Sequence, residues 1–143
     1  MRECMRSLVT YRGRSLGIVV LTALQFLVGV VHVFFGLWLL AAGSQATFVV
    51  SGQSPEVYSV YTLAFGLLVL IFTSGIWSGK RWGWVGTVAV SVFVAAADAL
   101  TLLSLPSIPG IPRSAAAPEI IYSFSVLLYL SQTHVRIKYK TKF

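Results

Sequence analysis

The sequence of 143 residues is 57% hydrophobic and only 10% charged, and its mean hydropathy is +0.83. Long apolar runs at this level are typical of membrane proteins and exclude a water-soluble globular domain. The formal net charge of +7 does not require a nucleic acid partner, because the basic residues flank the apolar runs, as topology signals do.

Four segments are apolar and long enough, or nearly so, for transmembrane helices, which need about 20 residues to cross the hydrocarbon. In chain order they are 15–42, 57–78, 82–105 and 118–134. The first is much longer than the ~7 to 15 apolar residues of a signal peptide, so we expect it to be retained as a helix. The connections leave no room for a soluble domain. We therefore predict a single, all-α transmembrane domain over 1–143.

The basic residues indicate the orientation of these helices. All Lys and Arg residues except Arg113 lie in the N-terminal tail, in the turn at Lys80 and Arg81, or in the C-terminal tail. Short segments rich in Lys and Arg stay cytoplasmic. The sequence therefore predicts a four-helix antiparallel bundle in the cell membrane with both termini on the cytoplasmic side.

Two proline motifs indicate where helices begin. Ser54-Pro55-Glu56 combines an N-cap residue, a Pro suited to the first helical position and an acid that complements the helix dipole. Pro118-Glu119 repeats the last two elements, so we expect the fourth helix to begin at Pro118. The turn between the second and third helices is too short to separate them, and these two helices are predicted to be neighbours.

Two ionisable residues, His32 and Asp98, lie deep in predicted helices, where an unpaired charge costs on the order of 3 kcal/mol. Counting at ~1.5 Å per residue places both at similar depth in the outer half of the membrane. We predict an inward-facing intramembrane pair, within hydrogen-bond reach or one water apart. The pair could be structural and fix helix packing, or functional, relaying protons or holding a cation.

Small and polar residues follow one face of each helix, and such stripes let helices approach closely in lipid. They predict that Gln25, Ser91 and Tyr122 lie in the bundle interior with the pair. Cys4 is the only cysteine, and the histidines and carboxylates do not cluster at metal-ligand spacing. His134 is too far from His32 for both to ligate one haem. We predict no catalytic residue, metal site or cofactor.

Three stretches carry a resemblance: Arg14-Ser15-Leu16-Gly17, Gly75 to Trp84, and Tyr129 to Arg136. With these stretches the chain resembles a broad group of small four-helix membrane proteins of archaea and bacteria, described mostly as membrane proteins alone. The resemblance implies a four-helix fold in a prokaryotic inner membrane and implies no activity.

Three classes of function fit these features. The leading hypothesis is a non-catalytic accessory or structural subunit of a larger membrane complex, whose partners are the lipid bilayer and other membrane subunits or a second copy. The alternative is a small homodimeric transporter or proton-coupled carrier that uses Asp98. A third is an enzyme or quinone-handling subunit that uses the outer-half residues His32, Tyr58, Tyr61, Asp98 and Tyr122.

Overall fold

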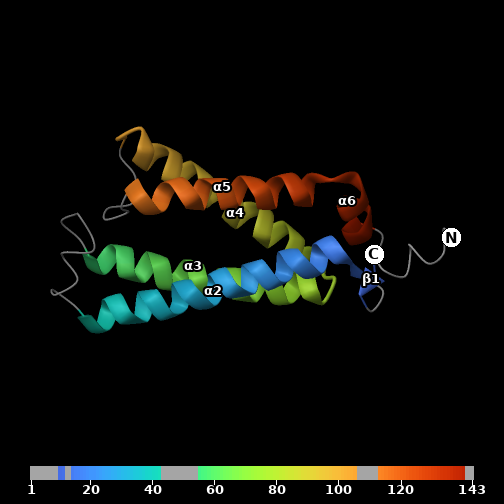
Figure 1. The fold of residues 1–143 in the computed structure, drawn as a ribbon, viewed down its shortest axis with the longest axis horizontal. Coiled ribbons are helices and arrows are strands. Elements are labelled where there is room, and N and C mark those ends of the chain that lie inside the picture. The colour runs from blue at the N-terminus through green and yellow to red at the C-terminus, as the bar shows by residue number, and fades with distance from the viewer. Residues whose placement is uncertain (1–9, 12–13, 43–54, 106–112, 141–143) are drawn as a thin grey trace.

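The structure is a computed structural model that describes residues 10–11, 14–42, 55–105 and 113–140. Two short antiparallel strands, β1 (Thr10–Tyr11) and β2 (Arg14–Ser15), precede the helices. The helices are α2 (Leu16–Ala42), α3 (Pro55–Trp77), α4 (Arg81–Leu102), α5 (Arg113–Ser131) and α6 (Thr133–Lys140). The described chain is therefore all-α apart from this strand pair (Figure 1).

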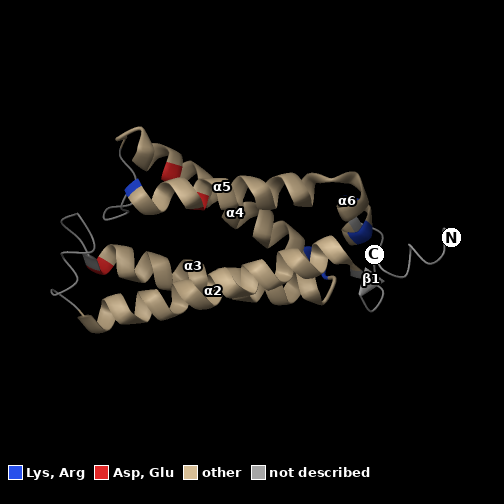
Figure 2. Ribbon diagram, in the orientation of Figure 1, with Lys and Arg blue, Asp and Glu red and all other residues tan. Residues whose placement is uncertain are grey.

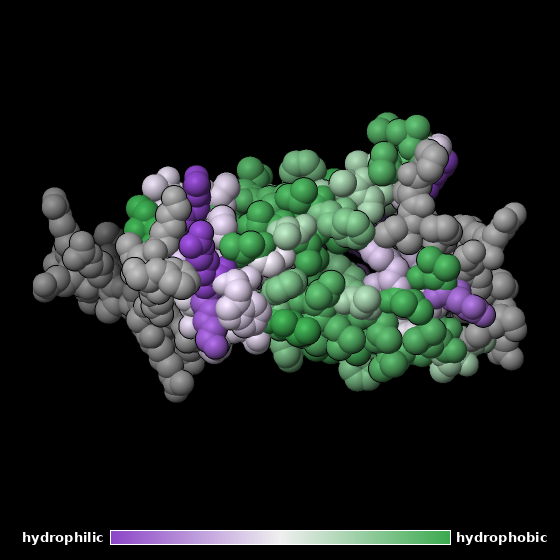
Figure 3. All heavy atoms as spheres, turned by 180° about the vertical axis from the view of Figure 1, so that it is seen from behind, coloured by the Kyte–Doolittle hydropathy of each residue, from purple (hydrophilic) through white to green (hydrophobic). Residues whose placement is uncertain are grey.

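Helices α2 to α5 are each long and apolar enough to cross a membrane, as the sequence predicts. Large hydrophobic side chains such as Phe34, Phe93 and Leu128 are exposed on them. Such a surface is stable against lipid rather than water. Figure 3 shows the apolar zone, bounded by a band of hydrophilic residues. We call the end that holds α6 and the α3–α4 turn the α6 end, and the opposite end the loop end.

The ends of α2, α3 and α4 differ from the predicted segments by at most three residues, but those of α5 are shifted. This helix begins at Arg113, so Pro118 lies inside it rather than at its first position. A Pro there leaves the carbonyl of Ser114 without its helical N–H partner. Ser114 is exposed near the helix start, where water can supply that hydrogen bond. The predicted start at Pro118 was therefore wrong.

The predicted fourth segment also ends too late, because the chain turns at Gln132. The backbone N–H of Gln132 bonds to the carbonyl of Tyr129, which tightens the last turn of α5. The Gln132 carbonyl then accepts from Val135 and Arg136 and starts α6. In Figure 1, α6 turns away from the axis of α5. Val135 and Tyr139 are buried, so α6 packs one face onto the ends of the longer helices.

The long helices pack mainly as two pairs. Helix α2 contacts α3 along its length, α4 contacts α5, and α4 also contacts α3. Figure 1 shows α4 running diagonally from the α3 side at the α6 end towards α5 at the loop end. The two pairs meet through side chains, and the largest buried cluster lies at the α6 end, formed by Ile18, Leu21, Ile76, Val126, Leu130, Val135 and Tyr139.

Two glycines make the α3–α4 turn possible. A Cβ on Gly83 would overlap the backbone of Gly75 and Ile76, so only a residue without a side chain lets the two helices approach this closely. Gly79 ends α3 with φ 68°, a left-handed conformation that favours glycine. The N–H of Lys80 then bonds to the carbonyl of Gly75 and closes the turn. The short connection thus makes α3 and α4 neighbours, as predicted.

Candidate functional site

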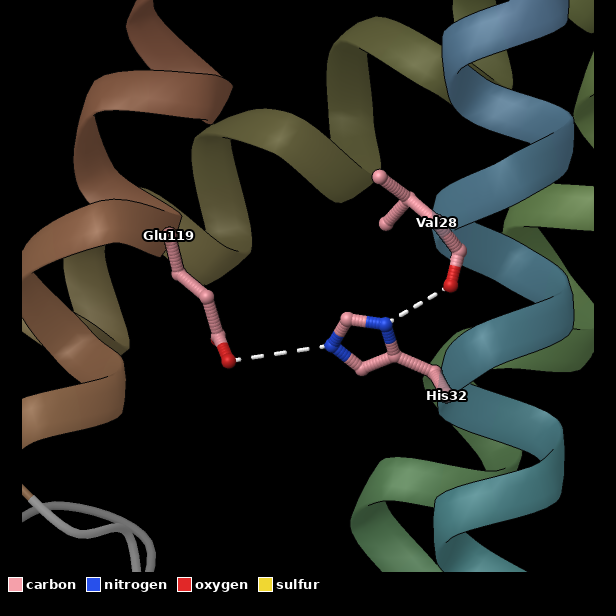
Figure 4. Close-up of polar contacts among 3 residues, drawn as sticks. All are labelled: Val28, His32 and Glu119. Atoms are coloured by element: carbon pink, nitrogen blue, oxygen red, sulfur yellow. Dashed lines mark hydrogen bonds and ion pairs between the residues drawn. The ribbon is translucent and has the colours of Figure 1, made fainter.

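His32 lies on α2 and faces α5. Its Nδ1 is 2.8 Å from the carbonyl oxygen of Val28, one helical turn earlier, and its Nε2 is 3.7 Å from Oε1 of Glu119 (Figure 4). The edge of the ring packs against Phe65 at a centroid distance of 4.8 Å. Both His32 and Glu119 side chains are 20% exposed. The imidazole is thus held by its own helix and by an aromatic ring, with Nε2 turned towards a carboxylate.

This geometry defines the proton chemistry of the contact. With Nδ1–H donating to the Val28 carbonyl, a neutral imidazole carries a lone pair on Nε2. That lone pair can accept a proton from a protonated Glu119, and the resulting imidazolium then faces a carboxylate. The 3.7 Å separation is an ion-pair distance, and a shorter approach is needed for a direct hydrogen bond. The His32–Glu119 contact is therefore suited to exchanging one proton.

Asp98 on α4 is completely buried, with 0% of its surface exposed. Neither carboxylate oxygen has a hydrogen-bond partner among the described residues. Asp98 interacts electrostatically with Glu119, so the two acids come from neighbouring helices to one region. A buried ion without a partner costs several kcal/mol, and such a group needs a proton, a cation or a polar ligand.

Tyr58 and Tyr61 on α3 complete this region, which we call the acidic cluster: His32, Tyr58, Tyr61, Asp98 and Glu119. Both tyrosines interact electrostatically with Asp98 and with Glu119. The two rings stack at a centroid distance of 6.5 Å. The Tyr61 hydroxyl is buried and has no hydrogen-bond partner within the part of the chain that the structure describes. The cluster therefore draws on all four long helices.

A second polar layer lies deeper in the bundle, around a cavity of about 10 Å³. Gln25, Thr87, Ser91 and Tyr122 line it, together with apolar side chains such as Phe65. The side-chain oxygens of two of these residues, Gln25 and Thr87, have no hydrogen-bond partner among the described residues. The volume is close to the ~10–15 Å³ that one water needs, and the lining offers several partners. A single water therefore fits between the polar residues predicted for the interior.

The prediction that His32 and Asp98 form a direct hydrogen bond is wrong, because both Asp98 oxygens lack a partner in the described chain. The histidine contacts Glu119 instead, and Glu119 also interacts with Asp98. A pairing of His32 with Asp98 through one water stays a prediction.

The sequence alone does not identify Glu119 as a member of the site. The motif Pro118-Glu119 indicates a helix start, in which Glu119 is a first-turn acid that complements the helix dipole. In the structure α5 starts at Arg113, which places Glu119 about 9 Å along the helix at ~1.5 Å per residue. The run Ser114-Ala115-Ala116-Ala117 was the available signal, since alanine is the strongest helix former. Extending the helix back through this run would have shown a third ionisable group inside the membrane.

The residue types present limit the chemistry of the site. Among the described residues, no three His, Cys, Asp or Glu side chains gather closely enough to hold a metal ion. His134 lies on α6 beside Tyr129, at the opposite end from His32. Two acids and an imidazole can instead bind and release protons, or balance the charge of one cationic group.

Only part of the acidic cluster reaches the surface of the molecule. His32 and Glu119 are partly exposed, whereas Asp98 is not. The acidic cluster thus has an exposed part and a fully buried part.

No family model, curated protein or solved structure matches this chain. The fold and the acidic cluster are therefore the only basis for a function.

Proposed function

We propose that this protein is a small proton-coupled carrier, which exchanges protons for a cationic solute at the acidic cluster and works as a homodimer. The observation that carries the proposal is Asp98, fully buried, without a hydrogen-bond partner among the described residues, and close to Glu119. Ionisable groups inside a membrane domain mark ion or proton pathways, because their burial is costly without a role.

The chemistry suggests the order of steps. A proton held at Asp98 or Glu119 leaves when a cation enters, since one positive charge then replaces another in a low-dielectric site. His32 can accept the departing proton at Nε2, which is turned towards Glu119, and release it towards the loop end of the bundle. Glu119, which contacts the histidine and interacts electrostatically with the buried acid, connects the two.

The proposed topology places the α6 end in the cytoplasm. Figure 2 shows the described Lys and Arg residues gathered at that end, with one exception at the loop end, and the described acids towards the loop end. The exception is Arg113, the first residue of α5. Because basic segments stay cytoplasmic, both termini lie inside and the acidic cluster lies in the outer half of the bilayer.

A transport assay tests this function. Proteoliposomes with an acidic interior, made by dilution of ammonium chloride, are given Na⁺, K⁺ or a lipophilic organic cation outside, and internal pH is followed by a trapped dye. At least one cation is expected to raise internal pH with the wild-type chain. Asp98→Asn and Glu119→Gln should abolish the response.

The control variant is Glu56→Gln, which removes an exposed acid from the first turn of α3 that is not part of the acidic cluster. Its response should match the wild type. If no cation moves internal pH, or if the Asp98 and Glu56 variants respond alike, the carrier proposal fails.

A second candidate, the accessory subunit, is favoured by a different observation. An apolar groove of about 570 Å³ runs between α2 and α3, lined by residues that include Phe26, Leu70 and Trp77. A helix of a neighbouring subunit would fill such a groove. Gentle solubilisation followed by native mass measurement tests it: a co-purifying subunit supports this candidate, and free monomer or homodimer alone contradicts it.

A further inference from the structure

A small basic pocket lies at the α6 end, far from the acidic cluster. Arg81, Trp84, Arg136 and Tyr139 line it, and its volume is about 50 Å³. At ~10–15 Å³ for each water-sized group, the space holds about three to five such groups, which suits a tetrahedral oxyanion.

The same sequence pattern, an arginine followed three residues later by an aromatic residue, occurs twice in the lining of this pocket. On α4, Arg81 and Trp84 are three residues apart, and on α6, Arg136 and Tyr139 are three residues apart. Residues at this spacing lie on one face of a helix. Because α6 turns onto the end of α4, the two faces meet and bring two guanidinium groups to one cavity.

The aromatic walls of the pocket are fixed in place. The indole N–H of Trp84 donates to the carbonyl oxygen of Leu130 at 3.2 Å, and the Tyr139 hydroxyl donates to the carbonyl oxygen of Ile76 at 3.1 Å. Arg81 and Arg136 are exposed on the surface. The aromatic walls are thus fixed, and each guanidinium group carries several N–H donors, more than one contact within the protein uses, so that others can bind an anion.

The electrostatic surroundings favour an anion. Arg81 is the first residue of α4, whose first turn has no acidic residue, and its N-cap residue Lys80 makes no side-chain capping bond. The positive end of the helix dipole therefore adds to the two arginines. The acids that the structure describes lie towards the other end of the molecule (Figure 2).

The pocket lies at the depth of lipid headgroups. Trp77 and Trp82, on the two sides of the α3–α4 turn, are both exposed, as tryptophans of an interfacial belt are. Figure 3 shows the hydrophilic band at the α6 end directly beside the apolar zone. A ligand in this band borders both water and hydrocarbon.

From these observations we propose that Arg81, Trp84, Arg136 and Tyr139 form a binding site for the phosphate group of an anionic phospholipid. The two guanidinium groups hold the phosphate oxygens, while the acyl chains extend along the apolar surface of the helices. The lipid would join α6 to the start of α4. This site does not depend on the carrier proposal.

Native mass spectrometry of the full chain in detergent tests the site, with phosphatidylglycerol, phosphatidylcholine and inorganic phosphate added separately. We expect the wild type to bind one phosphatidylglycerol more tightly than phosphatidylcholine or phosphate. The double variant Arg81→Gln/Arg136→Gln should weaken phosphatidylglycerol binding by about 30-fold, which corresponds to about 1 kcal/mol for each charge that contacts the phosphate.

The matched control is Lys80→Gln/Lys138→Gln, which removes the same charge from the same end outside the pocket lining. Its phosphatidylglycerol affinity should change by less than about threefold, since a local site depends on contact more than on net charge. Equal losses in the two double variants, or no loss in the arginine variant, would overturn the proposal. If inorganic phosphate bound as tightly as phosphatidylglycerol, the pocket would be a site for free phosphate, and the proposal of a lipid ligand would be overturned.

A single variant keeps the test valid if the double arginine variant does not fold. Arg136 is exposed on α6, so Arg136→Gln leaves the packed residues Val135 and Tyr139 unchanged. We expect it to weaken phosphatidylglycerol binding by about fivefold, the effect of one such charge. An unchanged affinity in this variant would also overturn the proposal.

Discussion

At the α6 end, Trp84 and Tyr139 donate hydrogen bonds to backbone carbonyls of other helices, whereas towards the loop end Asp98 is buried with no partner for either oxygen in the described chain. The largest buried apolar cluster also lies at the α6 end. A buried polar group that is satisfied stabilises a fold, and one left unsatisfied costs stability. The α6 end also holds buried hydroxyls without a partner among the described residues, those of Ser15 and Tyr129. Burying an unpartnered carboxylate costs far more than burying an unpartnered hydroxyl. The comparison therefore assigns structural support to the α6 end and makes the acidic cluster the candidate for function.

The largest expected effect is at the α3–α4 turn. In Gly83→Ala the added Cβ would overlap the backbone of Gly75 and Ile76, and backbone cannot move aside as a side chain can. We expect a loss of about 3 kcal/mol in the free energy of unfolding, at the upper end for overpacking. Titration with sodium dodecyl sulfate, followed by circular dichroism, measures it.

Gly17→Ala is the control for that substitution. Its Cβ would meet the ring and hydroxyl of Tyr129, at the far end of a side chain that can rotate. We expect less than about 1 kcal/mol of destabilisation. Equal losses in the two variants would show that the α3–α4 turn is not specially constrained.

Substitution of Asp98 should stabilise the protein, whereas Gly83→Ala destabilises it. Replacing a buried, unpartnered carboxylate by an apolar side chain removes a desolvation cost, so Asp98→Leu should raise the free energy of unfolding by about 2 kcal/mol. The same detergent titration measures the change. A destabilised Asp98→Leu variant would mean that the carboxylate has a structural role, which contradicts the assignment of function to this region.

The hydrogen bond of Tyr139 should have a smaller effect. Tyr139→Phe removes one of the two hydrogen bonds to the Ile76 carbonyl, which still accepts from the backbone N–H of Gly79. We expect a loss of about 1 kcal/mol, the usual net contribution of one hydrogen bond. Tyr129→Phe is the matched control, because the Tyr129 hydroxyl has no hydrogen-bond partner within the described residues. It should be close to neutral. Equal effects of the two substitutions would contradict the distinction between paired and unpaired hydroxyls.

The smallest effect concerns His32 and Glu119. A double-mutant cycle with His32→Gln and Glu119→Gln should give a coupling energy of about 0.5–1 kcal/mol in the unfolding titration, the range for a partly exposed ion pair. The same cycle with Asp98→Asn in place of Glu119→Gln should show weaker coupling to His32. A stronger coupling of His32 to Asp98 would restore the pairing predicted from the sequence.

Much of the fold could be predicted from the sequence because the bilayer restricts what a chain can do. Apolar runs of sufficient length must be helices, and the ends of α2, α3 and α4 follow from these runs. The short turn at Gly79 makes α3 and α4 neighbours, however the other helices pack. In contrast, α6 could not be predicted, because its packing depends on where Val135 and Tyr139 find a buried surface.

The site was only partly predictable, because it also depends on tertiary packing. The cost of burying ionisable groups points to His32 and Asp98 from sequence alone. Which carboxylate the imidazole contacts depends on the start of α5 and on the packing of helices distant in sequence. Local capping rules favoured Pro118 as a first residue, whereas the alanines before it extend α5 back to Arg113. Glu119 therefore lies inside the helix, where it contacts His32.

Cation-induced proton release tests the central claim most directly. Purified protein in weakly buffered nanodiscs is given each cation that was active in transport, and protons released to solution are counted with a pH-indicator dye. The acidic cluster predicts proton release from the wild type and from Glu56→Gln, and none from the double variant Asp98→Asn/Glu119→Gln. Undiminished release from that double variant would contradict the claim that this cluster is where protons and cations exchange.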